Sequence, residues 1–363
     1  MVIKRKSFDI YTVSAGSYPR IGSVRGQALR KLWNSYGEKK INNRVVPQEI
    51  RVAENSMAEE ILKEQISSGL DIITDGLVRW YCPISHIAGR MEGVLIGALH
   101  HFGDTNFHVR KAVVEDLPEW KVPLLADEIR FARSVTDKPM KAVLTGPATF
   151  CRHMENRSQK LPRAITGAYV EALCHEITLL AAVKGVAIIQ MDDPWLLHWP
   201  NEWDYFAGCY AVLYEALQRS NAHILLEVKI YGSKCSHMLS NLFELHCDYL
   251  GLDCVADPQA ILRILQNPVL LRESGLGLSI GIVDARSSIM EDPYMLERII
   301  EPLLLYMERP LLLESSCGLE FLPRRFAKEK CRILSETKRL LVKSALYKDT
   351  VKMYERRKET GNE

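Results

Sequence analysis

Short apolar runs recur along the chain, and each ends in polar, glycine or proline residues before a segment of helical periodicity. A run of about four to eight apolar residues predicts a buried strand, and apolar residues every three or four positions predict an amphipathic helix. The helix-like segments include 49–68 and 164–183. Eight predicted strands lie at 11–17, 70–74, 141–145, 186–191, 224–231, 249–255, 276–283 and 311–315.

The order of these elements predicts the fold class. Eight strands that alternate with helices form either a closed parallel barrel or two doubly wound sheets. No GxGxxG turn follows the first run and the alternation is unbroken, which favours one (β/α)8 TIM barrel over residues 1–363. Residues 80–120 are too many for a strand-to-helix loop and predict an insertion after strand 2, folded over the barrel mouth. Residues 335–363 predict a charged C-terminal helix.

Composition and charge narrow the function classes. The chain has 363 residues, is 47% hydrophobic and carries a net charge of +2, so bulk electrostatics favour neither nucleic acid nor an anionic membrane as partner. The N-terminus lacks the apolar segment of a signal peptide, and no run approaches the roughly 20 apolar residues of a membrane span. The nine cysteines form no CxxC pair. We expect a cytoplasmic protein whose thiols are free or metal-bound.

Polar residues gather where the predicted strands end, which is where a barrel of this class builds its active site. Each has an ordinary explanation when taken singly, because an Asp before Pro often caps a helix and an Arg often pairs with a neighbouring carboxylate. Such residues at nearly every strand end instead predict a polar pocket for a small zwitterionic or anionic ligand. They are Ser17, Arg20, Asp75, Arg79, Thr145, Gln190, Asp192, Asp193, Tyr231, Asp253, Asp284, Arg286 and Cys317.

The residue types suggest an amino-acid substrate. Asp192, Asp193 and Asp253 suit an ammonium group, and Ser17 with nearby backbone N–H groups suits a carboxylate. Cys317 is open to three interpretations: a nucleophile, a metal ligand or a small buried apolar residue. The chain has no Ser-His-Asp signature, P-loop or HExxH motif.

Taken as an ordered set, the strand-end motifs resemble the cobalamin-independent methionine synthase family, of which this chain looks like a short member with a single barrel. The resemblance runs in order over about residues 11–330. It rests on GSYPR at 16–20, ITDG at 73–76 with Arg79, LTGPAT at 144–149, IQMDDP at 189–194, GIVDAR at 281–286, SCGL at 316–319 and DTNF at 104–107.

The resemblance implies transfer of a methyl group to the sulfur of homocysteine, with a folate or a methylcorrinoid as donor. Family members bind zinc through a His-x-Cys pair on the fifth strand, a Glu after the sixth and a Cys after the eighth. Carried over by position, Cys317 remains and Asp253 stands for the Glu, whereas Val228 and Ile230 replace the His and Cys. The implied zinc site is therefore degenerate.

Other departures concern the catalytic residues. The family's catalytic histidine after the seventh strand aligns with Arg286, and the second acid of its Asp-Glu-Pro motif is Asp193, so the resemblance implies catalytic roles for Asp192, Asp193 and Arg286. The remaining strand-end residues would bind substrate. Substitute metal ligands near the fifth and sixth strands are conceivable at Cys235, His237, His246, Cys247 and Cys254.

Three functions remain open from the sequence. The first is methyl transfer to homocysteine or a related thiol, served by folate or by a separate corrinoid protein. The second is a zinc-free homologue with changed chemistry, in which Arg286 binds an anionic group. The third is a non-catalytic binding barrel that pairs with a separate catalytic subunit.

Overall fold

A ring of parallel strands forms the centre of the molecule. The computed structural model describes residues 9–36, 47–102, 108–220 and 223–359. Seven strands form one curved sheet in the order β1-β10-β9-β8-β7-β6-β4. Their bounds are β1 Ile10–Thr12, β4 Met140–Thr145, β6 Val186–Asp192, β7 Leu225–Ile230, β8 Tyr249–Asp253, β9 Gly277–Val283 and β10 Leu311–Ser315.

The segment 70–74 takes the eighth place and closes the ring. Ile72 bridges Val13, which follows β1, and Ile73 bridges Met140, the first residue of β4; both bridges are parallel. The prediction of a (β/α)8 barrel is thus confirmed.

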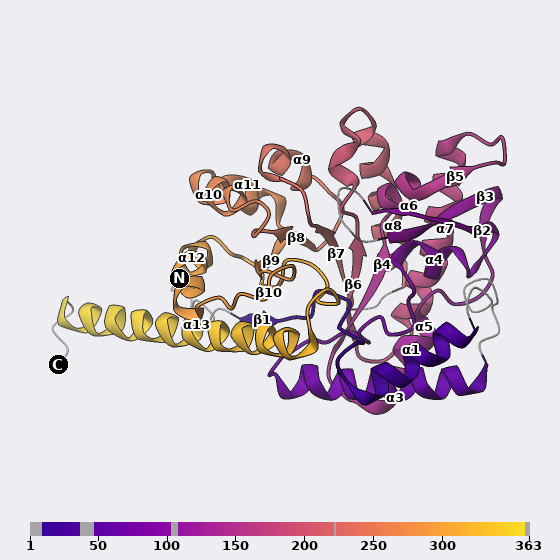
Figure 1. The fold of residues 1–363 in the computed structure, drawn as a ribbon. Coiled ribbons are helices and arrows are strands. Elements are labelled where there is room, and N and C mark those ends of the chain that lie inside the picture. The colour runs from indigo at the N-terminus through magenta and orange to yellow at the C-terminus, as the bar shows by residue number, and fades with distance from the viewer. Residues whose placement is uncertain (1–8, 37–46, 103–107, 221–222, 360–363) are drawn as a thin grey trace.

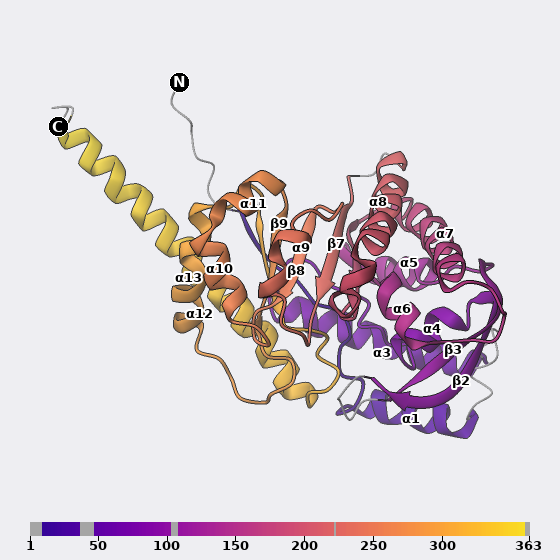
Figure 2. The same ribbon diagram turned by 90° about the horizontal axis from the view of Figure 1, so that it is seen from above.

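Helices cover the outside of the ring (Figures 1 and 2). No helix among the described residues has the length and apolar character needed to cross a membrane. The α-helices are α1 Val24–Tyr36, α3 Gln48–Ser67, α4 Pro83–Ala88, α5 Ala126–Val135, α6 Pro147–His153, α7 Pro162–Ala181, α8 Trp203–Arg219, α9 Leu239–Leu242, α10 Gln259–Gln266, α11 Pro268–Ser274, α12 Pro293–Ile300 and α13 Arg324–Glu359. Short 3-10 helices are η1 Leu196–His198, η2 Pro200–Glu202, η3 Ser236–Met238 and η4 Glu301–Leu305.

The insertion between the second strand segment and β4 contains a hairpin. Strands β2 (Met91–His101) and β3 (His108–Trp120) are antiparallel, and β5 (Met154–Asn156) pairs in parallel with β3. The hairpin packs against α4 and α7, and Trp120 Nε1 donates to Glu176 Oε2 of α7 at 3.2 Å. It therefore lies against the outer helices at the side of the barrel, and coverage of the mouth stays a prediction.

Alternation along the strands sorts side chains between two cores. Val228 and Ile230 of β7 belong to the large apolar core between strands and helices. At the bottom of the barrel interior an apolar layer forms from Val13, Ile72, Ile188, Tyr249 and Leu312. Since successive strand residues point to opposite faces, the neighbours of Val228 and Ile230 on β7 point into the barrel.

Above the apolar layer lies a set of buried charges, here called the charged layer: Lys141, Glu227, Lys229 and Glu314. Lys141 Nζ lies 2.6 Å from Glu227 Oε2 and 3.0 Å from Glu314 Oε2, and Lys229 Nζ also contacts Glu314. All four side chains are fully buried. Two lysines and two glutamates neutralise one another, which a dry interior requires.

Two glycines make room for the charged layer. A Cβ on Gly251 would lie 2.6 Å from Cδ of Lys229 and 2.7 Å from Oε1 of Glu227. A Cβ on Gly281 would lie 3.1 Å from Nζ of Lys229. The long Lys229 side chain therefore extends across two neighbouring strands where these have no side chain.

Candidate active site

The mouth of the barrel is built at the C-terminal ends of the strands. Ser17 follows β1, Tyr231 follows β7 and Cys317 follows β10, while Asp192 ends β6 and Asp253 ends β8. Burial raises the pKa of the Tyr231 hydroxyl, and the nearby carboxylate of Asp192 and thiol of Cys317 raise it further. The fold thus brings predicted site residues from opposite sides of the ring to one place.

Asp192 connects this mouth to the charged layer below it. Its Oδ1 accepts from Gln190 Nε2 at 2.6 Å, and Gln190 Oε1 accepts from Lys141 Nζ at 2.6 Å. Burial raises the pKa of the Asp192 carboxyl to about 8, against the smaller lowering effects of Gln190 and Lys229. Asp192 is therefore largely protonated at neutral pH and exchanges its proton near the pH at which thiols ionise.

Arg286 and Asp253 form a bidentate ion pair on the other side of the mouth. Nη1 of Arg286 donates to Asp253 Oδ2 at 2.8 Å, and Nη2 donates to Oδ1 at 3.2 Å. The carboxylate also accepts from the backbone N–H groups of Gly232, Val255 and Ala256 at 2.9, 3.1 and 2.9 Å. Asp253 is 1% exposed, whereas about a third of the Arg286 side chain faces solvent.

The residues present do not fit a zinc ion. Both oxygens of Asp253 are engaged by a guanidinium and three N–H groups, which leaves little room for a metal bond. Cys317 is one thiol whose pKa burial raises to about 12 in the absence of a metal, and no second thiol or imidazole is grouped with it among the described residues. Across the described part of the chain, no three His, Cys, Asp or Glu side chains are grouped to hold a metal.

The two residues at the positions of the missing zinc ligands lie in the apolar core. Val228 and Ile230 face the outer helices, so neither occupies a ligand position in the mouth. The side chains of this strand that face inward are Glu227 and Lys229, with Tyr231 following.

The substitute ligands also fail to assemble. Cys235, Cys247 and Cys254 are buried, and within the described residues they join no group of three potential metal ligands. His237 and His246 are exposed.

Asp193 makes its hydrogen bonds to residues of α6 and α8, and the catalytic role predicted for it stays a prediction. It is fully buried, and Thr149 donates to its Oδ1 through both N–H and hydroxyl at 2.6 Å. Ala148 N and Tyr210 Oη donate to Oδ2 at 3.2 and 2.7 Å. Asp193 therefore joins the first turn of α6 to α8, pointing away from the barrel interior.

Two further predicted residues donate hydrogen bonds to backbone carbonyl groups of the loop after the second strand. Arg20 Nη1 donates to the carbonyl of Val78 at 3.2 Å and also to that of Trp80, which fixes the loop after the second strand. Thr145 donates its hydroxyl hydrogen to the carbonyl of Pro83 at 3.2 Å. Binding of substrate by these two residues stays a prediction.

The other predicted residues lie near the rim or outside the barrel. Asp284 accepts from the backbone N–H of Arg286 at 2.9 Å and orients that residue. Asp75 is 1% exposed, and burial raises its pKa to about 7, with a further contribution from the nearby Glu128. Arg79 extends away from the mouth into a separate pocket beside α3 and α5.

Sequence reasoning missed Glu320, which lies beside the mouth. A Cβ on Gly318 would lie 2.0 Å from Ser17 Oγ and 2.7 Å from Glu320 Oε2, so both side chains pack on this glycine. Burial raises the pKa of Glu320 to about 7, and its Oε2 has no hydrogen-bond partner within the described residues. The available signal was an acid directly after the Ser-Cys-Gly-Leu motif.

A closed (β/α)8 barrel with acids, an arginine and a thiol at the C-terminal ends of its strands has the architecture of a TIM-barrel enzyme. The chain belongs to the family described as the catalytic domain of cobalamin-independent synthase, whose model matches residues 10–338. The resemblance drawn from the strand-end motifs is thus confirmed.

Known proteins extend the comparison. The chain is 26% identical to a methionine synthase of Sulfolobus acidocaldarius and 25% identical to one of Sulfurisphaera tokodaii, in both cases over 88% of each chain. Its fold is similar to a B12-independent methionine synthase from Shewanella sp. W3-18-1 in complex with selenomethionine (TM-score 0.77, 19% identity, 93% of this chain and 99% of that one). A methyltransferase from Methanosarcina mazei shares the fold at a TM-score of 0.60 and 10% identity, over 92% of this chain and 95% of that one.

Proposed function

We propose that the chain transfers a methyl group to the sulfur of homocysteine or a related thiol bound at the barrel mouth. The observation that carries this proposal is the position of Asp192, Ser17 and Tyr231 around one mouth in a chain that belongs to the cobalamin-independent synthase family. The methyl donor is a methylfolate or a protein-bound methylcorrinoid.

The charges at the mouth suit an amino-acid acceptor. Glu320 supplies a carboxyl group for the substrate ammonium and would ionise when a cation approaches and lowers its pKa. Ser17 and its backbone N–H are placed for the substrate carboxylate. The exposed part of Arg286 offers a positive charge to an anionic group, which in this reaction is the developing thiolate.

The reaction then needs a base in place of a metal. The substrate thiol gives its proton to the ionised Asp192 carboxylate, whose pKa of about 8 is close to the ordinary thiol value. The sulfur lone pair attacks the methyl carbon, and the new S–C bond forms as the bond between the methyl group and the donor breaks. The electron pair of that bond stays on the corrinoid cobalt or on the folate nitrogen, which takes up a proton from water. The thiol proton remains on the protein until product leaves.

A zinc-free homologue with changed chemistry is the second candidate. The Arg286–Asp253 pair favours it, because a guanidinium held by this pair and by Asp284 stands where the resemblance implies a catalytic histidine. In this candidate the mouth still binds an amino acid, but the group that reacts is not a thiol.

The test is turnover with both donors. Purified chain is incubated with homocysteine and either methyltetrahydrofolate or methylcobalamin, and methionine is measured by mass spectrometry. We expect methionine from one donor, a loss of at least about 100-fold in Asp192→Asn, and no loss in the control Asp204→Asn, which changes an exposed acid on α8.

Calorimetry of homocysteine binding separates the remaining outcomes. Binding that is lost in Glu320→Gln, without methionine from either donor, supports the second candidate. If the wild-type chain shows neither turnover nor binding, both candidates fail.

A further inference from the structure

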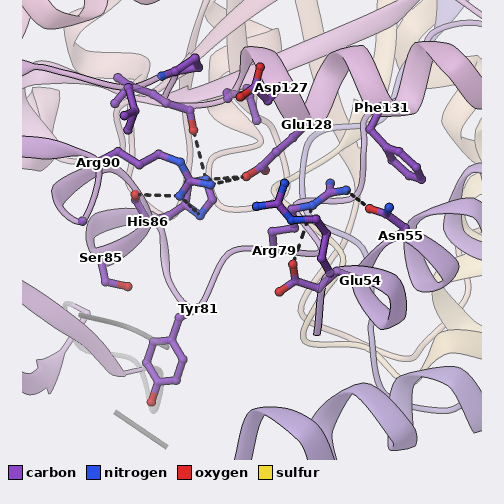
Figure 3. A pocket seen from close by; sticks show the side chains of 16 residues that line it. Glu54, Asn55, Arg79, Tyr81, Ser85, His86, Arg90, Asp127, Glu128 and Phe131 are labelled. Carbon is purple, nitrogen blue, oxygen red and sulfur yellow. Dashed lines mark hydrogen bonds and ion pairs between the residues drawn. The ribbon is translucent and has the colours of Figure 1, made fainter. Parts of the chain in front are cut away.

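A polar cavity outside the barrel mouth has no part in the proposed reaction. It has a volume of about 450 Å³ and lies between α3, α5 and the segment 79–90, and is here called the side pocket. Figure 3 shows Arg79, Glu54 and Asn55 together on one side of this space, and Arg90, His86 and Glu128 together on another.

The carboxylate of Glu128 is already neutralised. It accepts from Arg90 Nη2 at 2.7 Å, from Trp80 Nε1 at 3.3 Å and lies 3.1 Å from His86 Nε2. Burial lowers the pKa of His86 to about 4, so this ring is neutral at neutral pH. Its Nδ1 accepts a hydrogen bond from Arg90 Nη1 at 3.1 Å. Arg90 is the cation that balances Glu128.

Arg79 on the other side is incompletely paired. Its side chain is 13% exposed, Nη2 donates to Asn55 Oδ1, and the guanidinium stacks over the Phe131 ring with a distance of 5.0 Å to the centroid. The carboxylate of Glu54 is 3.9 Å from Nε. Nη1 is buried and has no hydrogen-bond partner among the described residues.

The carboxyl groups of Glu54, Asp75 and Glu128 act electrostatically on Arg79, but within the described residues none of them accepts a hydrogen bond from its Nη1. Glu54 also interacts with Arg20, so one carboxylate serves two guanidinium groups. A third, Arg51, lines the same pocket and is exposed. Asp127 lies at the rim with its side chain mostly in solvent and pairs with Arg130 at 2.7 Å. A buried guanidinium nitrogen without an acceptor is a costly arrangement that an oxyanion would relieve.

We propose that the side pocket is a second binding site, separate from the barrel mouth, for a ligand that carries a carboxylate or phosphate group. The oxyanion accepts hydrogen bonds from Nη1 of Arg79, and Arg51 adds positive charge at the entrance. Guanidinium groups suit both planar carboxylates and phosphates because their N–H groups form a fixed fork.

The experiment is calorimetric titration of the purified full chain with inorganic phosphate and, separately, with glutarate. We expect one site whose affinity Arg79→Gln weakens about tenfold or more, as loss of a charge-assisted hydrogen bond implies. Any binding of the probes at Arg286 in the mouth should persist in this variant. The control Arg219→Gln removes a mostly exposed arginine on α8 and should keep the wild-type affinity. Tighter binding of phosphate assigns a phosphorylated ligand, and tighter binding of glutarate assigns a carboxylate one.

Two outcomes overturn the proposal: no binding of either probe at millimolar concentration, or an unchanged affinity in Arg79→Gln. If Arg79→Gln fails to fold, Arg51→Gln decides instead, because this exposed residue can be replaced without disturbing the interior. A weakening of about threefold in Arg51→Gln supports the site, and an unchanged affinity refutes it.

Discussion

The charged layer inside the barrel makes a quantitative prediction about Glu314. This carboxylate contacts both Lys141 and Lys229, and none of the three side chains is exposed. Substitution of Glu314 by Gln keeps the shape of the side chain and one acceptor oxygen but leaves two buried ammonium groups with Glu227 as their one remaining carboxylate. The resulting surplus charge lies where solvent cannot screen it.

The size of the effect follows from known cases. Removal of one partner of a buried ion pair costs about 3–5 kcal/mol, and Gln should fall near the lower end because it still accepts a hydrogen bond. Unfolding entropy of roughly 2.1 cal/mol/K per residue gives about 0.76 kcal/mol/K for a chain of 363 residues. The melting temperature of Glu314→Gln should therefore fall by about 4–7 °C.

A double variant separates charge from packing. Lys229→Met combined with Glu314→Gln leaves one ammonium, Lys141, facing one carboxylate, Glu227, at the observed 2.6 Å. Urea unfolding followed by circular dichroism should show at least half of the lost stability restored. Glu273→Gln, at an exposed position of α11, is the control and should change stability by less than about 0.5 kcal/mol. The reasoning is refuted if Glu314→Gln costs less than about 1 kcal/mol, or if the double variant is no more stable than the single one.

Three further predictions address the site. Protein purified with added zinc should hold far less than one zinc per chain, and stoichiometric zinc lost on Cys317→Ala would contradict the fit drawn from Asp253 and Arg286. Because burial raises the pKa of Asp192 to about 8, the folded chain keeps a proton that the unfolded chain releases, so stability falls as pH rises from about 4 to 8. Asp192→Asn should flatten this fall in urea titrations between pH 5 and 8, less than completely because Asp75 and Glu320 act in the same direction; an unchanged slope would count against the assignment. Asp193→Ala should cost about 2–4 kcal/mol through its lost hydrogen bonds while kcat/KM of the folded protein stays within about threefold, and a larger kinetic loss would restore the catalytic role.

Apolar periodicity predicted the barrel because it depends on burial alone. The run at 311–315 coincides with β10, and the run at 186–191 differs from β6 by one residue. The first predicted strand, 11–17, was too long, because β1 ends at Thr12. After Thr12 the chain makes a single parallel bridge, from Val13 to Ile72, and then forms part of the mouth. Composition does not show where a strand leaves its ladder.

The site was harder to predict because it depends on which face each side chain occupies. Asp192 and Asp193 are adjacent acids in one motif, yet alternation sends the first to the mouth and the second to α6. Arg79 follows the strand end as expected, but its long side chain reaches past the barrel wall, and no sequence pattern fixes that direction.

The room that Gly251 and Gly281 leave for Lys229 has a consequence for comparisons among relatives. A substitution at any one member of the charged layer leaves a buried charge without its partner. A side chain at either glycine would collide with Lys229 unless that lysine changes its conformation. Viable changes therefore come as sets that span several strands. A relative with an apolar residue in place of Glu314 should lack Lys229 as well, and its two glycine positions are then free to accept larger residues. Covariation of these four positions would trace when the interior of this barrel acquired its charges.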